Sequence, residues 1–79
     1  MVRILYFASC REKAGLTVEE LDVGGRTVDE VVRVIALRHP ALAPLVPRCR
    51  VAVNQAFVRG GDVVPEGAEL ALVPPVAGG

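Results

Sequence analysis

A single capped helix pattern, standing among short strand-like runs, restricts this chain to few folds. Thr27 and Glu30 have the spacing of a capping box, in which each side chain binds the backbone amide of the other residue. Apolar residues recur after Thr27 at helical spacing, and Pro40 stops the pattern. Many of these apolar residues are β-branched and would suit a strand, but the capping and charge signals favour a helix from Thr27 to His39. His39, the only histidine, is expected to complement the helix dipole.

Five short runs rich in β-branched and aromatic residues predict strands around this helix. They cover residues 2–9, 17–23, 50–54, 56–59 and 69–73. One helical turn is expected at residues 11–14, ended by Gly15. The first two runs are too close in sequence for a crossover connection, so we expect them to pair as an antiparallel hairpin. This order predicts an α+β fold, with a mixed sheet of about five strands packed on one main helix.

The composition agrees with one small domain that commits its apolar residues to a single core. The chain has 79 residues, of which 52% are hydrophobic, and no apolar run is long enough to span a bilayer. Nine basic residues balance nine acidic ones, which disfavours nucleic acid as a partner. No secretory signal follows Met1, so we expect a cytoplasmic protein. So small a core leaves little room for a deep pocket, and we expect no catalysis by the domain alone.

Cysteine and histidine usage predicts neither a metal centre nor a nucleophilic active site. Cys10 and Cys49 have a spacing that fits no metal or redox motif, and we expect two ordinary free thiols. No Ser/His/Asp or Cys/His pair lies close in sequence, so the usual catalytic constellations have little support.

Alternation along the strands predicts a second apolar face that the helix does not cover. Charged and polar residues such as Arg3 and Glu69 mark the solvent side of their strands. The residues of opposite parity should pack under the helix: Ile4, Tyr6, Ala56, Val58, Leu70 and Leu72. The apolar residues left on the uncovered face are Leu5, Phe7, Phe57 and Val73. Such a patch usually marks a partner surface, although a one-residue shift of register would bury these residues instead.

The last six residues predict an extended tail after a domain of residues 1–73. They are Pro74, Pro75, Val76, Ala77, Gly78 and Gly79. The prolines stop the strand and stiffen the chain, and six extended residues reach about 20 Å. A terminal α-carboxylate is ionised and unreactive at neutral pH, so another protein must activate it, most simply as an acyl phosphate. Because glycine has no β-carbon, such an activated carbonyl is open to attack by an amine, a thiol or sulfide. The alternative interpretation of these six residues is a frayed terminus without a function.

With these features, the sequence resembles the ubiquitin-like β-grasp family and, within it, the sulfur carrier subunits of molybdopterin synthase. The resemblance covers residues 2–79. The matching stretches are Leu5-Tyr-Phe-Ala8, Arg11-Glu12 with Gly15, Thr27-Val28, Val51-Ala-Val-Asn-Gln55 with Val58, Gly61-Asp62, and Val73-Pro-Pro-Val-Ala-Gly-Gly79.

The resemblance implies that Gly79 is adenylated by an ATP-using enzyme similar to ubiquitin-activating enzymes. A sulfur-donor protein would then convert it to a thiocarboxylate. The tail would insert into the large catalytic subunit of a heterotetramer, where the sulfur passes to cyclic pyranopterin monophosphate. Phe7, Phe57 and Val73 fall where the family has hydrophobic partner contacts. The domain itself would bind no cofactor, because ATP belongs to the activating enzyme and the sulfur is covalent at Gly79. For Arg11 and Glu12 we expect only a surface turn.

Three other functions fit the same features. The first is a sulfur carrier for another pathway, such as thiamine thiazole, tRNA thiolation or cysteine synthesis. The stretch from Phe7 to Gly15 argues against the thiazole carrier, which typically begins with a shorter first hairpin. The second is a ubiquitin-like modifier joined to lysines of other proteins. The third is an inert interaction module.

Overall fold

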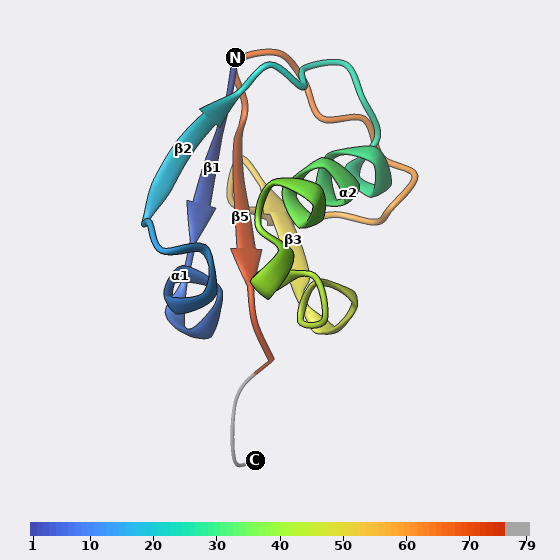
Figure 1. Cartoon of the computed structure of the whole chain (residues 1–79). Coiled ribbons are helices and arrows are strands. Elements are labelled where there is room, and N and C mark those ends of the chain that lie inside the picture. The colour runs from blue at the N-terminus through green and yellow to red at the C-terminus, as the bar shows by residue number, and fades with distance from the viewer. Residues whose placement is uncertain (76–79) are drawn as a thin grey trace.

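Five strands form one mixed sheet in the order β2-β1-β5-β3-β4, in a computed structural model that describes residues 1–75 (Figure 1). The strands are β1 (Val2–Tyr6), β2 (Val18–Leu21), β3 (Arg50–Val53), β4 (Ala56–Phe57) and β5 (Glu69–Val73). Strand β1 pairs antiparallel with β2 and parallel with β5, whereas β3 pairs antiparallel with β5 and β4. The predicted α+β fold and its antiparallel first hairpin are confirmed.

The main helix α2 (Val28–Arg38) lies across the sheet, and α1 (Ala8–Ala14) lies beyond the end of β1 (Figure 1). Two short 3₁₀ helices, η1 (Pro40–Leu42) and η2 (Val46–Arg48), follow α2. The capping box is formed: the Thr27 hydroxyl oxygen accepts from the amide of Glu30, whose carboxylate accepts from the Thr27 amide at 2.9 Å. Local capping therefore outweighs the β preference of the valines in this segment.

The first strand is shorter than predicted. It ends at Tyr6 rather than at Ser9, because α1 begins at Ala8 and takes up seven residues instead of a single turn. Ala8 has a φ of 46°, a conformation that is uncommon outside glycine and that turns the chain out of the strand. The Phe7 backbone is still extended, with φ −115° and ψ 149°. Its side chain therefore alternates with that of Tyr6 and lies on the opposite side of the sheet.

The hairpin of β3 and β4 is joined by a two-residue turn at Asn54 and Gln55, both with positive φ, as a type I′ turn requires. Asn54 also ties this turn to β5: its amide donates to the Glu69 carbonyl, and its side-chain oxygen accepts from the Glu69 amide at 3.0 Å. The edge strand β4 ends at Phe57 instead of at Arg59. Ala56 is exposed, so its predicted place under the helix is wrong, because alternation has little meaning in a strand of two residues.

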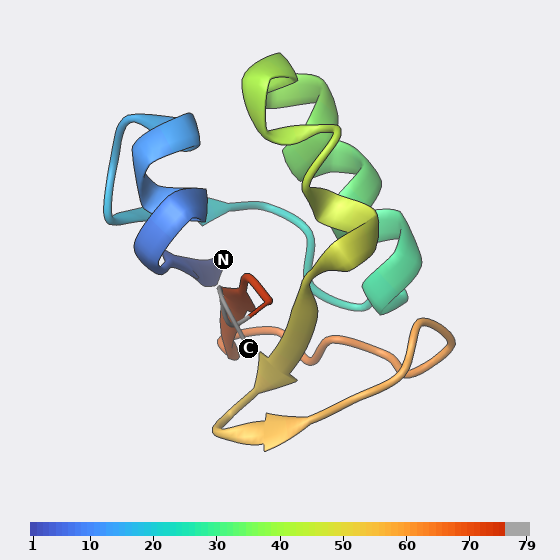
Figure 2. The same ribbon diagram turned by 90° about the horizontal axis from the view of Figure 1, so that it is seen from below.

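The core lies between the sheet and α2. Figure 2 shows α2, and the segment that follows α2, on one side of β5 and β3. Ile4, Tyr6, Leu70 and Leu72 are buried there, as alternation predicted. Val28, Val31 and Ile35 supply the buried stripe of α2. Val58 is partly buried and packs against this core.

Candidate functional site: the uncovered sheet face and the tail exit

The sheet face opposite α2 carries a row of apolar residues that crosses all five strands. The strand register places one residue from each strand in line: Val18, Leu5, Ala71, Ala52 and Phe57. Residues paired in this way point to the same face of a sheet, so they form one continuous surface, which we call the apolar row. Its two ends are the most exposed, Val18 at 38% and Phe57 at 56%.

The apolar row lies next to the point where the chain leaves the sheet. Strands β1 and β5 run parallel (Figure 1), and Tyr6 pairs with Leu72. Phe7, which follows β1, and Val73, the last residue of β5, therefore lie at the same end of the sheet. Val73 ends β5 and is followed by Pro74, which is partly buried, and Pro75, which is exposed. Ala71 in the apolar row is only two residues from Val73, which is about 7 Å along a strand. The apolar face and the base of the tail therefore form one continuous area.

The four residues predicted for the partner face differ in exposure. Phe7 is 47% exposed and Phe57 is 56% exposed, so both phenylalanines of the chain lie outside the core. Leu5 and Val73 are partly buried, because neighbouring strands flank them on both sides. Val76, Ala77, Gly78 and Gly79, the rest of the predicted tail, lie outside the described residues.

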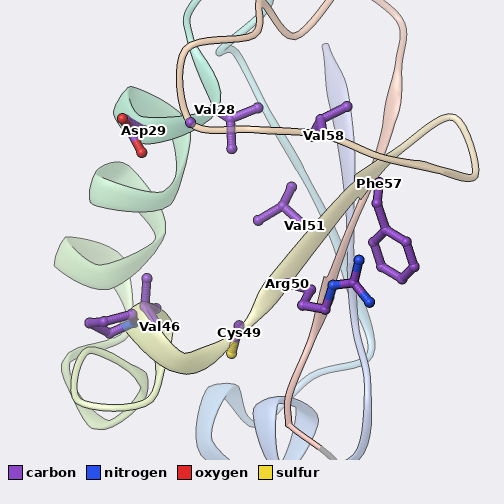
Figure 3. A pocket seen from close by; sticks show the side chains of 10 residues that line it. Val28, Asp29, Val46, Cys49, Arg50, Val51, Phe57 and Val58 are labelled. Atoms are coloured by element: carbon purple, nitrogen blue, oxygen red, sulfur yellow. The ribbon is translucent and has the colours of Figure 1, made fainter.

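Arg50 is a feature of this face that sequence reasoning missed. Its guanidinium carbon lies 3.7 Å from the centre of the Phe57 ring, close enough for a cation–π contact. Figure 3 shows the two side chains next to each other beside β3. Arg50 pairs with Val73 in the sheet register and so places a positive charge at the base of the tail. The pairing of β3 with β4 brings Arg50 and Phe57 together, and the contact could have been predicted only from the register of that pairing.

A pocket of about 320 Å³ lies beside this contact, between the start of α2 and β3 (Figure 3). Apolar residues such as Val28, Val51 and Val58 line it, but most of its exposed lining surface is polar, and Asp29 lies at one side. Within residues 1–75, no group of His, Cys, Asp or Glu is placed to hold a metal ion. In the same part of the chain, no helix has the length and apolar character to cross a membrane.

The main polar cluster lies elsewhere, around the carboxylate of Glu19 on β2. This carboxylate accepts hydrogen bonds from the Tyr6 hydroxyl at 2.6 Å and from Arg38 at 3.1 Å, and it contacts the His39 ring. Desolvation alone would raise the pKa of Glu19, but the hydrogen bonds from Tyr6 and His39 outweigh it and hold the pKa below its ordinary value. Burial and the bond to Glu19 raise the pKa of Tyr6.

This cluster ties β1 and β2 to the end of α2. His39 is the C-cap residue of α2, at the helix terminus where it was expected, and its ring meets the Tyr6 ring edge-on at 5.6 Å. We assign the cluster a structural role, because Tyr6, Arg38 and His39 all contact the same Glu19 carboxylate. Arg11 and Glu12, for which the sequence suggested only a surface turn, are exposed on α1.

The chain is similar to known proteins over its whole length. A model of the ThiS family matches residues 4–79. The molybdopterin synthase sulfur carrier subunit of Chlamydomonas reinhardtii is 40% identical, over 99% of this chain and 98% of its own length. The human protein of the same name is 35% identical, over 99% of this chain and 93% of its own length.

A solved structure gives the same result for the fold. The crystal structure of SAMP1 from Haloferax volcanii matches with a TM-score of 0.88 and 32% identity, over 99% of this chain and 98% of that one. The fold is the ubiquitin-like β-grasp. By the family model and these full-length relatives, the chain belongs to the ThiS family.

Proposed function

We propose that this protein is the sulfur carrier subunit of molybdopterin synthase. The observation that carries the proposal is the junction of the apolar face with the base of the tail, in a chain whose full-length relatives bear that name. A carrier must present its terminus to other proteins while its folded body is held by them. Pro74 and Pro75 direct the chain away from β5, and Phe7 and Phe57 offer exposed aromatic surface for docking.

In this proposal Gly79 is the reacting residue. Its carboxylate oxygen attacks the α-phosphorus of ATP on an activating enzyme and displaces pyrophosphate. Sulfide released by a donor protein then attacks the carbonyl of the acyl adenylate, AMP leaves, and a thiocarboxylate results. Adenylation is needed because a carboxylate carries negative charge at neutral pH and resists attack by a second anion. Glycine has no β-carbon, so the carbonyl stays open to the incoming sulfur.

The charged terminus would then enter the large catalytic subunit. The thiocarboxylate sulfur bonds to cyclic pyranopterin monophosphate, and water then attacks the carbonyl, breaks its bond to sulfur and regenerates the carboxylate. Two such transfers build the dithiolene of molybdopterin. Ala77 carries only a methyl group, and Gly78 and Gly79 have no side chain, so the end of the tail suits a tight channel. The apolar row and Phe7 would meet the large subunit around the mouth of that channel, so that docking energy places the sulfur.

A protein modifier is the second candidate, because SAMP1 of Haloferax volcanii is described as a small archaeal modifier protein. One assay separates the two functions. The protein is incubated with its activating enzyme, ATP and a sulfur donor, and products are analysed by intact mass and by denaturing electrophoresis. A carrier gains the mass of one oxygen-to-sulfur exchange, whereas a modifier yields ladders of conjugates. The chain has one lysine, Lys13, so Lys13→Arg removes ladders formed between copies of the protein itself.

Deletion of Gly78 and Gly79 tests the reacting end directly. The shortened protein should bind the large subunit and unfold like the wild type, yet transfer no sulfur. Retained transfer would refute the role of Gly79. The large subunit from the same organism, assayed for molybdopterin formation, also distinguishes this pathway from thiamine, tRNA or cysteine synthesis.

A further inference from the structure

We propose that Cys10 and Cys49 form an intramolecular disulfide when the folded protein meets a low-molecular-weight disulfide such as oxidised glutathione. The two sulfur atoms lie 3.4 Å apart although the residues are 39 positions apart in sequence. Both are free thiols in the structure. A disulfide bond of about 2.05 Å therefore requires the sulfurs to move closer by little more than 1 Å.

The surroundings of the two thiols give them different roles. Cys10 lies on α1 and is fully buried in the core, whereas Cys49, just before β3, is partly exposed. An external oxidant therefore reaches Cys49 first. The hydrogen bonds agree: the Cys49 thiol donates to the Leu45 carbonyl at 3.3 Å, which leaves its sulfur to accept the hydrogen of Cys10. A Cys49 thiolate would still accept the hydrogen bond from the Cys10 thiol, which stabilises its charge. Cys49 is therefore the thiol that ionises and attacks.

The reaction then has two balanced steps. The Cys49 thiolate attacks one sulfur of glutathione disulfide, and one glutathione thiolate leaves. Cys10 loses its proton to solvent and attacks the Cys49 sulfur of the mixed disulfide, and the second glutathione thiolate leaves. Two protein thiols are oxidised, and one small disulfide is reduced to two thiols.

The bond would cross the fold at the place where the tail begins. Cys49 precedes Arg50, which pairs with Val73 at the end of β5. Cys10 belongs to α1, which follows the end of β1 on the other side of β5. The disulfide would thus join the segments that flank the last residues of β5 and brace the base of the tail. This inference does not depend on the proposed function, because it concerns only the two thiols.

The pH dependence of the rate should follow thiolate formation. Burial, together with the hydrogen bond to Cys49, raises the pKa of the Cys10 thiol to about 12. Burial also raises the pKa of Cys49, although the hydrogen bond from Cys10 partly offsets the effect. At a pH below the pKa of both thiols, the rate of oxidation should increase about tenfold for each pH unit, because the thiolate fraction does.

The test uses the full-length reduced protein and excess oxidised glutathione at pH 8.5, followed by acid quenching and intact mass analysis. The wild type should lose two hydrogen atoms and remain monomeric. Cys10→Ala should stop at one glutathione adduct on Cys49, whereas Cys49→Ala should stay unmodified because Cys10 is buried. The oxidised wild type should melt on the order of 10 °C higher, because the bond closes a long loop, and a reductant should reverse the shift.

Three results would overturn the proposal. They are a stable glutathione adduct on the wild type, a disulfide-linked dimer, and no reaction within the time that oxidises the urea-unfolded protein completely. Peptide mapping of the wild type after alkylation gives the same answer without any variant, so a poorly folding Cys10→Ala does not compromise the test.

Discussion

Phe57→Asp should separate binding to the large subunit from folding. Phe57 is 56% exposed on the edge strand β4, at one end of the apolar row. A phenylalanine side chain has about 200 Å² of surface, so about 110 Å² remains for a partner to bury. At about 25 cal/mol per Å², this burial contributes about 3 kcal/mol to binding, or a factor of about 100 in Kd. Burying a carboxylate there would add a further cost, so we expect at least this loss.

The same substitution should leave the domain folded. The remaining surface of Phe57, about 90 Å², contributes at most about 2 kcal/mol to folding, and the cation–π contact with Arg50 about 0.5–1 kcal/mol. A domain of 79 residues is typically stable by about 4–12 kcal/mol, which exceeds this sum throughout the range. The new carboxylate can also pair with Arg50, which recovers part of the loss.

Val63→Asp is the matched control, because Val63 is 59% exposed and pairs with Thr27 beside the start of α2. Calorimetric titration against the large subunit should give a Kd raised about 100-fold or more for Phe57→Asp and nearly unchanged for Val63→Asp. Urea unfolding of both variants should show cooperative transitions. Equal losses of affinity in the two variants would refute the docking surface, and loss of folding in Phe57→Asp alone would refute the assignment of this residue to the uncovered face.

Two further predictions concern stability. Glu19→Gln should cost about 2–3 kcal/mol in urea unfolding at pH 7, because the charge-assisted bonds from Tyr6 and Arg38 are lost. The pKa of Glu19 is held low in the folded state, so its contribution is present above the ordinary pKa of about 4.3 and is lost as the pH falls through the folded value. The difference between variant and wild type should therefore shrink towards pH 3, and a constant difference would contradict this reasoning. Thr27→Ala removes the cap that accepts from the Glu30 amide and should cost about 1 kcal/mol, seen as a fall of about 4–8 °C in Tm, whereas an unchanged Tm would exclude a stabilising cap.

The sequence alone determined those features that depend on neighbours along the chain. A capping box joins residues three positions apart, so α2 could be predicted from Thr27 and Glu30 against the β preference of its valines. Alternation with a period of two placed Tyr6 inside and Phe7 outside, because successive side chains of extended backbone point to opposite faces. The end of β5 at Val73 coincides with the position where Pro74 removes a strand donor.

Only the tertiary structure decided which distant residues meet. The sheet order β2-β1-β5-β3-β4 brings β2 and the end of α2 together, so that Glu19 binds Tyr6, Arg38 and His39. The same packing places the sulfurs of Cys10 and Cys49 side by side, although their spacing matches no motif. These contacts depend on the path of the whole chain through one core. A local pattern describes the path over a few residues only, and therefore cannot encode them.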